Sequence, residues 1–240
     1  IYSCLSSNKL KKMETKKQKW DESYSRHENA IFYAKEEVVK FLNRFIRKKI
    51  DVNQFKDLLS KNNKLRALDL GCGIGRQTIL FEEFGIEGYG LDISNVAINE
   101  AKKLSKKMGF EMNSRFSTIN KIEIPFEDNF FDLAISDCVL DSMNFSFAKM
   151  YLKEFERVVK DYLYISLISG HNTEEGGNFS GDVLVKEAFE EGTIQSHYNR
   201  EKINELISET KFEIVFLSIN IEKNFLNNQE YGRFHVVLKK

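Results

Sequence analysis

The sequence predicts an α/β fold with a doubly wound, mostly parallel sheet. An apolar run over 65–70 leads directly into Gly71-Cys72-Gly73-Ile74-Gly75, a succession typical of a strand, a tight turn and a helix. Strand-like and helix-like segments then alternate as far as residue 169, which is the pattern of parallel strands joined by crossover helices. With 240 residues, 42% of them hydrophobic, the chain is long enough to bury one sizeable core, so we expect a single domain with additions.

The segment before the glycine motif is predicted to contain a basic tail and a helical extension. The first nineteen residues hold six lysines and show little apolar periodicity, so we expect 1–19 to form a flexible tail. Met13 is a candidate for the natural start, which the intact mass of the natively expressed protein would test. Apolar side chains recur at helical spacing over 36–46. The single domain is therefore expected over 20–240.

The core of the sheet is expected over 64–169, followed by a loop region and a C-terminal pair of strands. The predicted core strands and helices are strands at 65–70, 86–91, 111–117, 131–136 and 162–169, and helices at 77–84, after the N-cap Ser94, and at 147–159. Residues 171–182 are polar and rich in glycine, so we expect a long substrate loop region over 170–198. Within 199–240 we expect a helix capped by Asn199 that runs to residue 208, and strands at 212–219 and 233–238.

The glycine spacing and one acidic residue indicate which ligand the loop binds. A dinucleotide site needs a third glycine five residues after the first, where this chain has Arg76. Asp69, two residues before the first glycine, would place a carboxylate beside the phosphates of a dinucleotide, whereas it would attract a ligand with an ammonium group. S-adenosylmethionine carries an ammonium and a sulfonium. A cationic, adenosine-bearing cofactor is therefore favoured over NAD, and a titration with NAD would test this.

At these residues the chain resembles the class I S-adenosylmethionine-dependent methyltransferase superfamily, in its small-molecule branch. The first motif of that superfamily is an acid, a spacer and Gly-x-Gly-x-Gly, as in Asp69 to Gly75, and its second motif matches at Asp92. The resemblance implies a Rossmann-like, seven-stranded sheet that ends in an antiparallel hairpin. It also implies that Asp69 helps to hold the methionine amino group and that Asp92 holds both ribose hydroxyls. The residues that would lie against the methionine part are Gly71, Cys72, Gly73 and Gly75.

Four further residues are candidates for the cofactor site. By the same resemblance, Ile93 and Ile119 would enclose the adenine ring, although ordinary core isoleucines would give the same pattern. Many relatives hold the adenine amino group with an acid after the third strand, and a hydroxyl such as that of Thr118 would partly replace that acid here. Asp137 directly follows the fourth strand. Since ligands of open α/β sheets bind outside the carboxyl ends of the strands, Asp137 is expected to line the same pocket.

The acceptor side offers three candidates for acid–base catalysis. Methyl transfer from a sulfonium is an in-line displacement with an activated leaving group, so a catalytic base is optional. Asp141 follows the fourth strand, His171 opens the glycine-rich loop, and His197 lies near its end. For Asp141 a helix-capping or solvated carboxylate is the alternative interpretation.

Aromatic residues near the N-terminus suggest a lid. The segment Trp-Asp-Glu-Ser-Tyr at 20–24 resembles one that closes over the site in many small-molecule methyltransferases. We therefore expect 20–63 to form an N-terminal helical lid that includes Trp20, Tyr24 and Tyr33. An aromatic anchor that packs the N-terminal helix onto the sheet is the alternative.

Composition limits the partners. Lys plus Arg equals Asp plus Glu at 36 each, which disfavours nucleic acid, and the Asn/Asp-Pro-Pro-Tyr/Phe tetrapeptide of amino-methylating nucleic-acid enzymes is absent. No apolar run reaches the roughly 20 residues that span a bilayer, so we expect a cytoplasmic protein without membrane association. Cysteines and histidines lack metal-ligand spacing, so no metal is expected. The oligomeric state stays open.

The expected activity is methyl transfer from S-adenosylmethionine to an oxygen or nitrogen atom of a small molecule, with S-adenosylhomocysteine as the product. Two alternatives stay open: an RNA or protein methyltransferase, and a catalytically silent subunit that binds S-adenosylmethionine.

Overall fold

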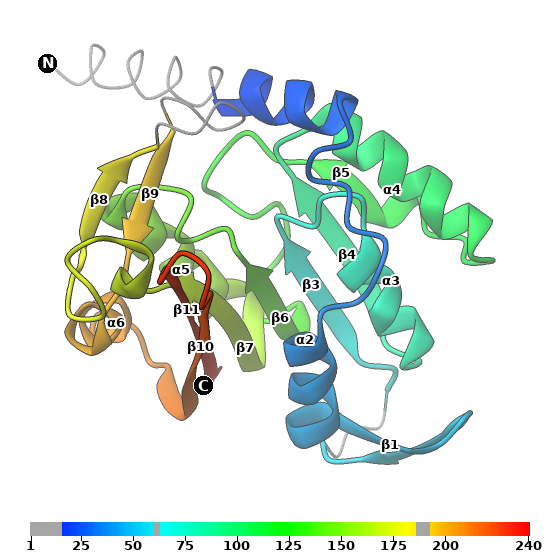
Figure 1. The fold of residues 1–240 in the computed structure, drawn as a ribbon. Coiled ribbons are helices and arrows are strands. Elements are labelled where there is room, and N and C mark those ends of the chain that lie inside the picture. The colour runs from blue at the N-terminus through cyan, green and yellow to red at the C-terminus, as the bar shows by residue number, and fades with distance from the viewer. Residues whose placement is uncertain (1–15, 60–62, 186–192) are drawn as a thin grey trace, which may run out of the picture.

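A computed structural model describes residues 16–59, 63–185 and 193–240, and its centre is one seven-stranded sheet (Figure 1). The spatial order of the strands is β10 (Glu213–Lys223), β11 (Glu230–Lys239), β7 (Val159–Ile168), β6 (Phe131–Asp137), β3 (Arg66–Leu70), β4 (Glu87–Asp92) and β5 (Phe116–Thr118). The five strands from β7 to β5 are parallel, while β11 is antiparallel to both β7 and β10. The predicted fold class is therefore confirmed, including the C-terminal antiparallel hairpin.

Helices cover both faces of this sheet, because each face needs an apolar layer against it. The first face is covered by α2 (Glu36–Phe41), the π-helical turn η1 (Leu42–Ile46) and α3 (Arg76–Glu83), whose buried side chains pack with those of β3, β6 and β7. The second is covered by α5 (Phe145–Val158) and α6 (Arg200–Ile207). Beside α3 lies α4 (Asn95–Lys107). Among the described residues, no helix has the length and apolar character needed to span a membrane.

Two predicted helix caps are confirmed. The hydroxyl of Ser94 accepts a hydrogen bond from the Ala97 amide at 3.1 Å and so begins α4. The Asn199 side chain accepts one from the Lys202 amide at 2.9 Å and begins α6. Ser94 thereby anchors the turn between β4 and α4, which borders the site described below.

The N-terminal part differs from the expected tail and helical lid. Residues 16–25 are helical and are called the N-terminal helix below, so the part of the predicted tail at 16–19 is wrong, while 1–15 lie outside the described residues. An unexpected antiparallel hairpin follows η1, formed by β1 (Arg47–Asp51) and β2 (Gln54–Asp57). Phe55 in this hairpin packs against Phe84 with ring centroids 5.4 Å apart. This contact with a residue distant in sequence explains why helical periodicity alone did not indicate the hairpin.

Two other segments also differ from expectation. The third core strand is shorter and later than predicted, because 113–115 form the 3-10 turn η2 (Asn113–Arg115) and only Phe116 of β5 is buried. The expected long loop contains a 3-10 turn, η3 (Gly170–Asn172), and a two-stranded ribbon of β8 (Gly181–Leu184) and β9 (Ile194–His197). The ribbon is held to the core by the Ser196 amide, which donates to the Asp141 carbonyl at 2.7 Å.

Candidate functional site

A cavity of ≈ 220 Å³ lies where β3, β4 and β6 end. Parallel strands place these carboxyl ends at one rim of the sheet, which is the usual ligand position in open α/β folds. The structure brings ten of the predicted site residues into its lining: Asp69, Gly71, Cys72, Gly73, Asp92, Ile93, Ile119, Asp137, Trp20 and Tyr24. Other lining residues, among them Lys16, Asn29, Ile31, Lys35, Val139 and Met143, were not predicted.

The glycine loop supplies one wall of the cavity. Gly73 has a left-handed φ of +53°, and a Cβ there would lie 2.6 Å from the Tyr24 hydroxyl oxygen. Gly75 also has a left-handed φ, of +83°, but a Cβ there would meet the Phe116 ring at 2.8 Å. Gly75 and Thr118 do not line the cavity. Gly73 therefore gives the site room, whereas Gly75 allows the turn to pack against β5.

Asp92 fixes the geometry between the glycine loop and α4. Its Oδ2 accepts the Gly73 amide and its Oδ1 accepts the Ser94 amide, each at 2.8 Å. Burial raises the pKa of Asp92 above its usual value, because water does not solvate the charge. Each carboxylate oxygen has two acceptor lone pairs, so both oxygens keep capacity to accept from a ligand.

Asp69 is a second buried carboxyl in the same cavity. It is 2% exposed, and the Thr78 hydroxyl donates to its Oδ2 at 2.7 Å. Burial, together with the negative charges of Asp137 and Asp92, raises the pKa of Asp69 to about 7. A cation beside Asp69 would relieve this unfavourable environment, so the cavity favours a positively charged ligand group at this position.

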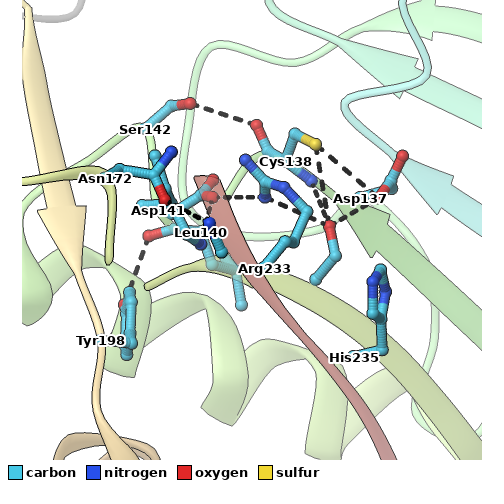
Figure 2. Close-up of polar contacts among 12 residues, drawn as sticks. Asp137, Cys138, Leu140, Asp141, Ser142, Asn172, Tyr198, Arg233 and His235 are labelled. Carbon is cyan, nitrogen blue, oxygen red and sulfur yellow. Dashed lines mark hydrogen bonds and ion pairs between the residues drawn. The ribbon is translucent and has the colours of Figure 1, made fainter. Parts of the chain in front are cut away.

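Asp137 belongs to a polar cluster that Figure 2 shows. Lys35 Nζ lies 2.6 Å from Asp137 Oδ2 and 3.1 Å from Cys138 Sγ. The Ser166 hydroxyl donates to Asp137 Oδ1 at 2.5 Å and accepts the Cys138 amide at 3.0 Å. Burial opposes ionisation of Asp137, but the ammonium of Lys35 and the Ser166 bond outweigh it and lower its pKa. Asp137 is therefore held as a carboxylate at the cavity wall.

The N-terminal helix lies across the end of the sheet toward which β3, β4 and β6 point (Figure 1). Asp21 accepts the Ser94 hydroxyl at 2.6 Å, and Lys16 donates to the Ser142 carbonyl at 2.6 Å. Tyr24 is buried against the glycine loop, with its ring 6.0 Å from that of Trp20. Tyr33, in contrast, is 70% exposed and does not line the cavity. The N-terminal helix thus bridges two sides of the cavity, whereas Tyr33 takes no part.

The three predicted catalytic residues do not line the cavity. Asp141 is 2% exposed, and its Oδ2 accepts both Arg233 Nη1 at 2.6 Å and the Ile168 amide at 2.8 Å. His171 Nδ1 lies 2.9 Å from the Ser169 hydroxyl, and His197 is buried in β9, where burial lowers its pKa. Asp141 is therefore neither the helix-capping nor the solvated carboxylate of the alternative interpretation, but a buried carboxylate paired with Arg233. In the described part of the chain, no group of three or more His, Cys, Asp or Glu side chains is placed to hold a metal ion.

Comparisons with known proteins identify related sequences. The family model described as "Methyltransferase domain" matches residues 61–229. The mRNA cap guanine-N(7) methyltransferase of Schizosaccharomyces pombe is 34% identical over 80 residues, which cover 30% of this chain and 22% of that protein. The chloroplastic tocopherol O-methyltransferase of Arabidopsis thaliana is 26% identical over 126 residues, which cover 49% of this chain and 36% of that protein. The chain thus spans well under half the length of these relatives.

Solved structures share the fold. A SAM-dependent methyltransferase from Methanosarcina mazei has a TM-score of 0.61 at 22% identity, over 74% of this chain and 92% of that one. The magnesium protoporphyrin IX methyltransferase of Synechocystis, with bound SAM, has a TM-score of 0.53 at 16% identity, over 74% of this chain and 70% of that one. The overall fold is therefore shared with both of these structures.

Proposed function

Because the chain belongs to the methyltransferase-domain family, we propose that it transfers the methyl group of S-adenosylmethionine to an oxygen or nitrogen atom of a small molecule. One observation carries the proposal: Asp69, the glycine loop and Asp92 line a single cavity beneath the N-terminal helix. Asp69 before the loop and Asp92, which accepts the Gly73 amide, together suit a ligand with a cationic amino acid part and a ribose.

The cavity residues suggest how the cofactor would be held. The oxygens of Asp92 would accept the ribose hydroxyls, since each is already oriented by one backbone amide. Asp69 would face the ammonium group, whose charge its buried carboxyl favours. Ile93 and Ile119 would contact the adenine ring from the cavity wall. Thr118 does not line the cavity, so its contact with the adenine amino group stays a prediction.

The bound cofactor supplies an activated methyl group, so the protein needs mainly to align the acceptor and exclude water. The N-terminal helix covers the cavity with Trp20 and Tyr24. Asp137, kept ionised by Lys35, would face the positive side of the cofactor. The geometry assigns no general base, and an amine presented without its proton would need none.

A small acceptor fits the balance of charge and the covered cavity better than a polymer does. Basic and acidic residues are equal at 36 each, so no net field draws in a polyanion. The cap methyltransferase acts on mRNA, but the match covers 22% of that protein. The names of two other similar proteins contain magnesium protoporphyrin IX and tocopherol, which are small molecules.

Calorimetric titration with S-adenosylmethionine, S-adenosylhomocysteine and NAD tests the cofactor. We expect micromolar binding of the first two and none of NAD. Asp92→Ala should weaken binding by about tenfold or more, because a hydrogen bond to a charged group contributes about 1.5–3 kcal/mol. Glu87→Ala is the matched control, since Glu87 begins the same strand, β4, at the opposite end.

A screen of small acceptors with methyl-labelled cofactor then tests turnover. Transfer of label to an oxygen or nitrogen atom is the expected result. Binding of the cofactor without any transfer would favour the catalytically silent subunit instead. Equal affinity of wild type and Asp92→Ala in folded protein would contradict the cofactor assignment itself.

A further inference from the structure

Arg233 is a cation at the same rim as the cavity, on a strand from the far end of the chain. In the antiparallel pairing of β11 with β7, Arg233 lies opposite Ile168, the last residue of β7. Because β7 and β6 are parallel, this register places Arg233 beside the carboxyl ends of both. Its side chain is 29% exposed, so part of it is open to solvent at the rim.

One edge of this guanidinium is held in place. Arg233 Nη1 donates to Asp141 Oδ2 at 2.6 Å, and Asp141 is itself fixed by the Ile168 amide at 2.8 Å. Figure 2 shows the Arg233 side chain lying between Asp141 and Cys138. A buried carboxylate that accepts a hydrogen bond from one nitrogen orients the planar guanidinium and limits its rotation. Supporting residues orient ligand-binding side chains in the same way in other binding sites.

The other edge is open. Among the described residues, which are 16–59, 63–185 and 193–240, Arg233 Nε and Nη2 have no hydrogen-bond partner. Every hydrogen bond of this side chain there is made by Nη1. Two parallel N–H groups of a guanidinium match the two oxygens of a carboxylate, so an oriented guanidinium with a free edge is suited to bidentate recognition. Lysine would not provide this geometry.

Arg233 lies close to the cavity wall without lining the cavity. Arg233 Nη1 is 3.5 Å from the Ser166 hydroxyl, which donates to Asp137 at 2.5 Å, and Asp137 lines the cavity. Two ion pairs lie here, since Lys35 pairs with Asp137 and Arg233 pairs with Asp141.

We infer that the methyl acceptor carries a carboxylate and that the open edge of Arg233 binds it. This inference rests on the proposed function and narrows its substrate class. The carboxylate positions the acceptor by binding to Arg233. The ion pair with Asp141 orients the Arg233 guanidinium for this contact. Asp141 is thus a positioning residue that acts through Arg233, which explains its burial away from the cavity lining.

The test uses benzoate and benzamide as probes, because they share a shape and differ in charge. Protein saturated with S-adenosylhomocysteine is titrated with each probe while the guanidinium Nε–H signals are followed by NMR. The Arg233 signal is identified by its absence in Arg233→Gln. We expect benzoate to shift this signal and to bind at least about tenfold more tightly than benzamide, with the difference lost in Arg233→Gln.

Two further variants keep the result interpretable. Arg233→Gln leaves Asp141 as an unpaired buried charge, so the double variant Asp141→Asn/Arg233→Gln removes both charges and protects the fold. Arg66→Gln is the matched control, because Arg66 begins β3 at the opposite end of the sheet. We expect it to bind benzoate as wild type does.

Failure of the inference and failure of the proposed function give different results. Loss of S-adenosylhomocysteine binding in folded wild-type protein would remove the proposed function. Normal S-adenosylhomocysteine binding with equal affinity for benzoate and benzamide, or with benzoate binding retained in the double variant, would overturn the role of Arg233. Absence of benzoate binding at its highest soluble concentration would overturn it as well.

Discussion

Asp21 accepts a hydrogen bond from the Ser94 hydroxyl at 2.6 Å, so the N-terminal helix is fastened to the residue that caps α4. The same carboxylate oxygen lies 3.3 Å from the Val96 amide. An acidic side chain at the start of a helix is favourable, because the first amides of the helix are unpaired and carry partial positive charge. The contact therefore couples closure of the cavity to the end of a core helix.

Asp21→Ala should loosen the N-terminal helix while leaving the core folded. We expect S-adenosylhomocysteine affinity to fall by about tenfold, because the variant loses hydrogen bonds to a charged group. Calorimetry would measure the affinity, and hydrogen exchange would report protection over 16–25. Glu22→Ala is the control on the same helix, where Glu22 is exposed. Unchanged protection in Asp21→Ala would show that the contact does not hold the helix.

Gly73→Ala should be destabilising in a way that depends on Tyr24. The added Cβ would lie 2.6 Å from the Tyr24 hydroxyl but 3.4 Å from the nearest ring carbon. Tyr24→Phe removes the hydroxyl, so a double-mutant cycle by chemical denaturation should give a coupling of about 1 kcal/mol. Gly109→Ala is the control, because Gly109 also has a left-handed φ, of +85°, but no atom within 4 Å of an added Cβ. Additive effects of Gly73→Ala and Tyr24→Phe would contradict the predicted clash.

Asp69→Asn should stabilise the empty protein, and more so at high pH. The pKa of Asp69 is raised from 3.8 to about 7, so the stability that its protonation contributes is complete below about pH 4 and is lost as pH rises through 7. Asparagine stays neutral throughout. Thermal unfolding should therefore show a larger gain for the variant at about pH 8 than at about pH 5. An equal gain at both values would mean that Asp69 does not titrate in this range.

Cofactor binding should release a proton from Asp69. An ammonium group beside the carboxyl lowers its pKa below about 7, so affinity should rise as pH increases through that value. Calorimetry in buffers with different ionisation enthalpies would count the proton. Asp69→Asn, where any binding persists, should show no release from this site. Proton uptake by the wild type would contradict the assignment.

The sequence predicted those parts of the site whose residues are close together along the chain. Asp69, Gly71 and Gly73 fall within one turn, and Asp92 ends the next strand, so a local pattern with known spacing was enough to find them. Ser94 and Asn199 were found in the same way, because a helix cap acts on an amide three residues later.

The missing parts depend on contacts between distant segments. Lys35 lies 103 residues from Cys138 and Arg233 lies 92 residues from Asp141, so no periodicity or spacing links them. The ribbon of β8 and β9 likewise depends on pairing between two short strands, the first of which begins within the glycine-rich stretch 171–182 that predicts a loop. Asp141 was expected on the acceptor side, but it does not line the cavity, and its pairing with Arg233 on β11 is a contact that sequence spacing does not reveal.

Asp21 and Lys16 fasten the N-terminal helix over the cavity, and these contacts should affect the rate at which a ligand exchanges. We predict that a ligand beneath the helix enters or leaves only after those contacts break, which would make exchange a first-order process of the protein itself. The observed association rate should then reach a plateau as cofactor concentration rises, at the rate of helix release. The same release would set an upper limit on turnover, because spent cofactor departs by the same route.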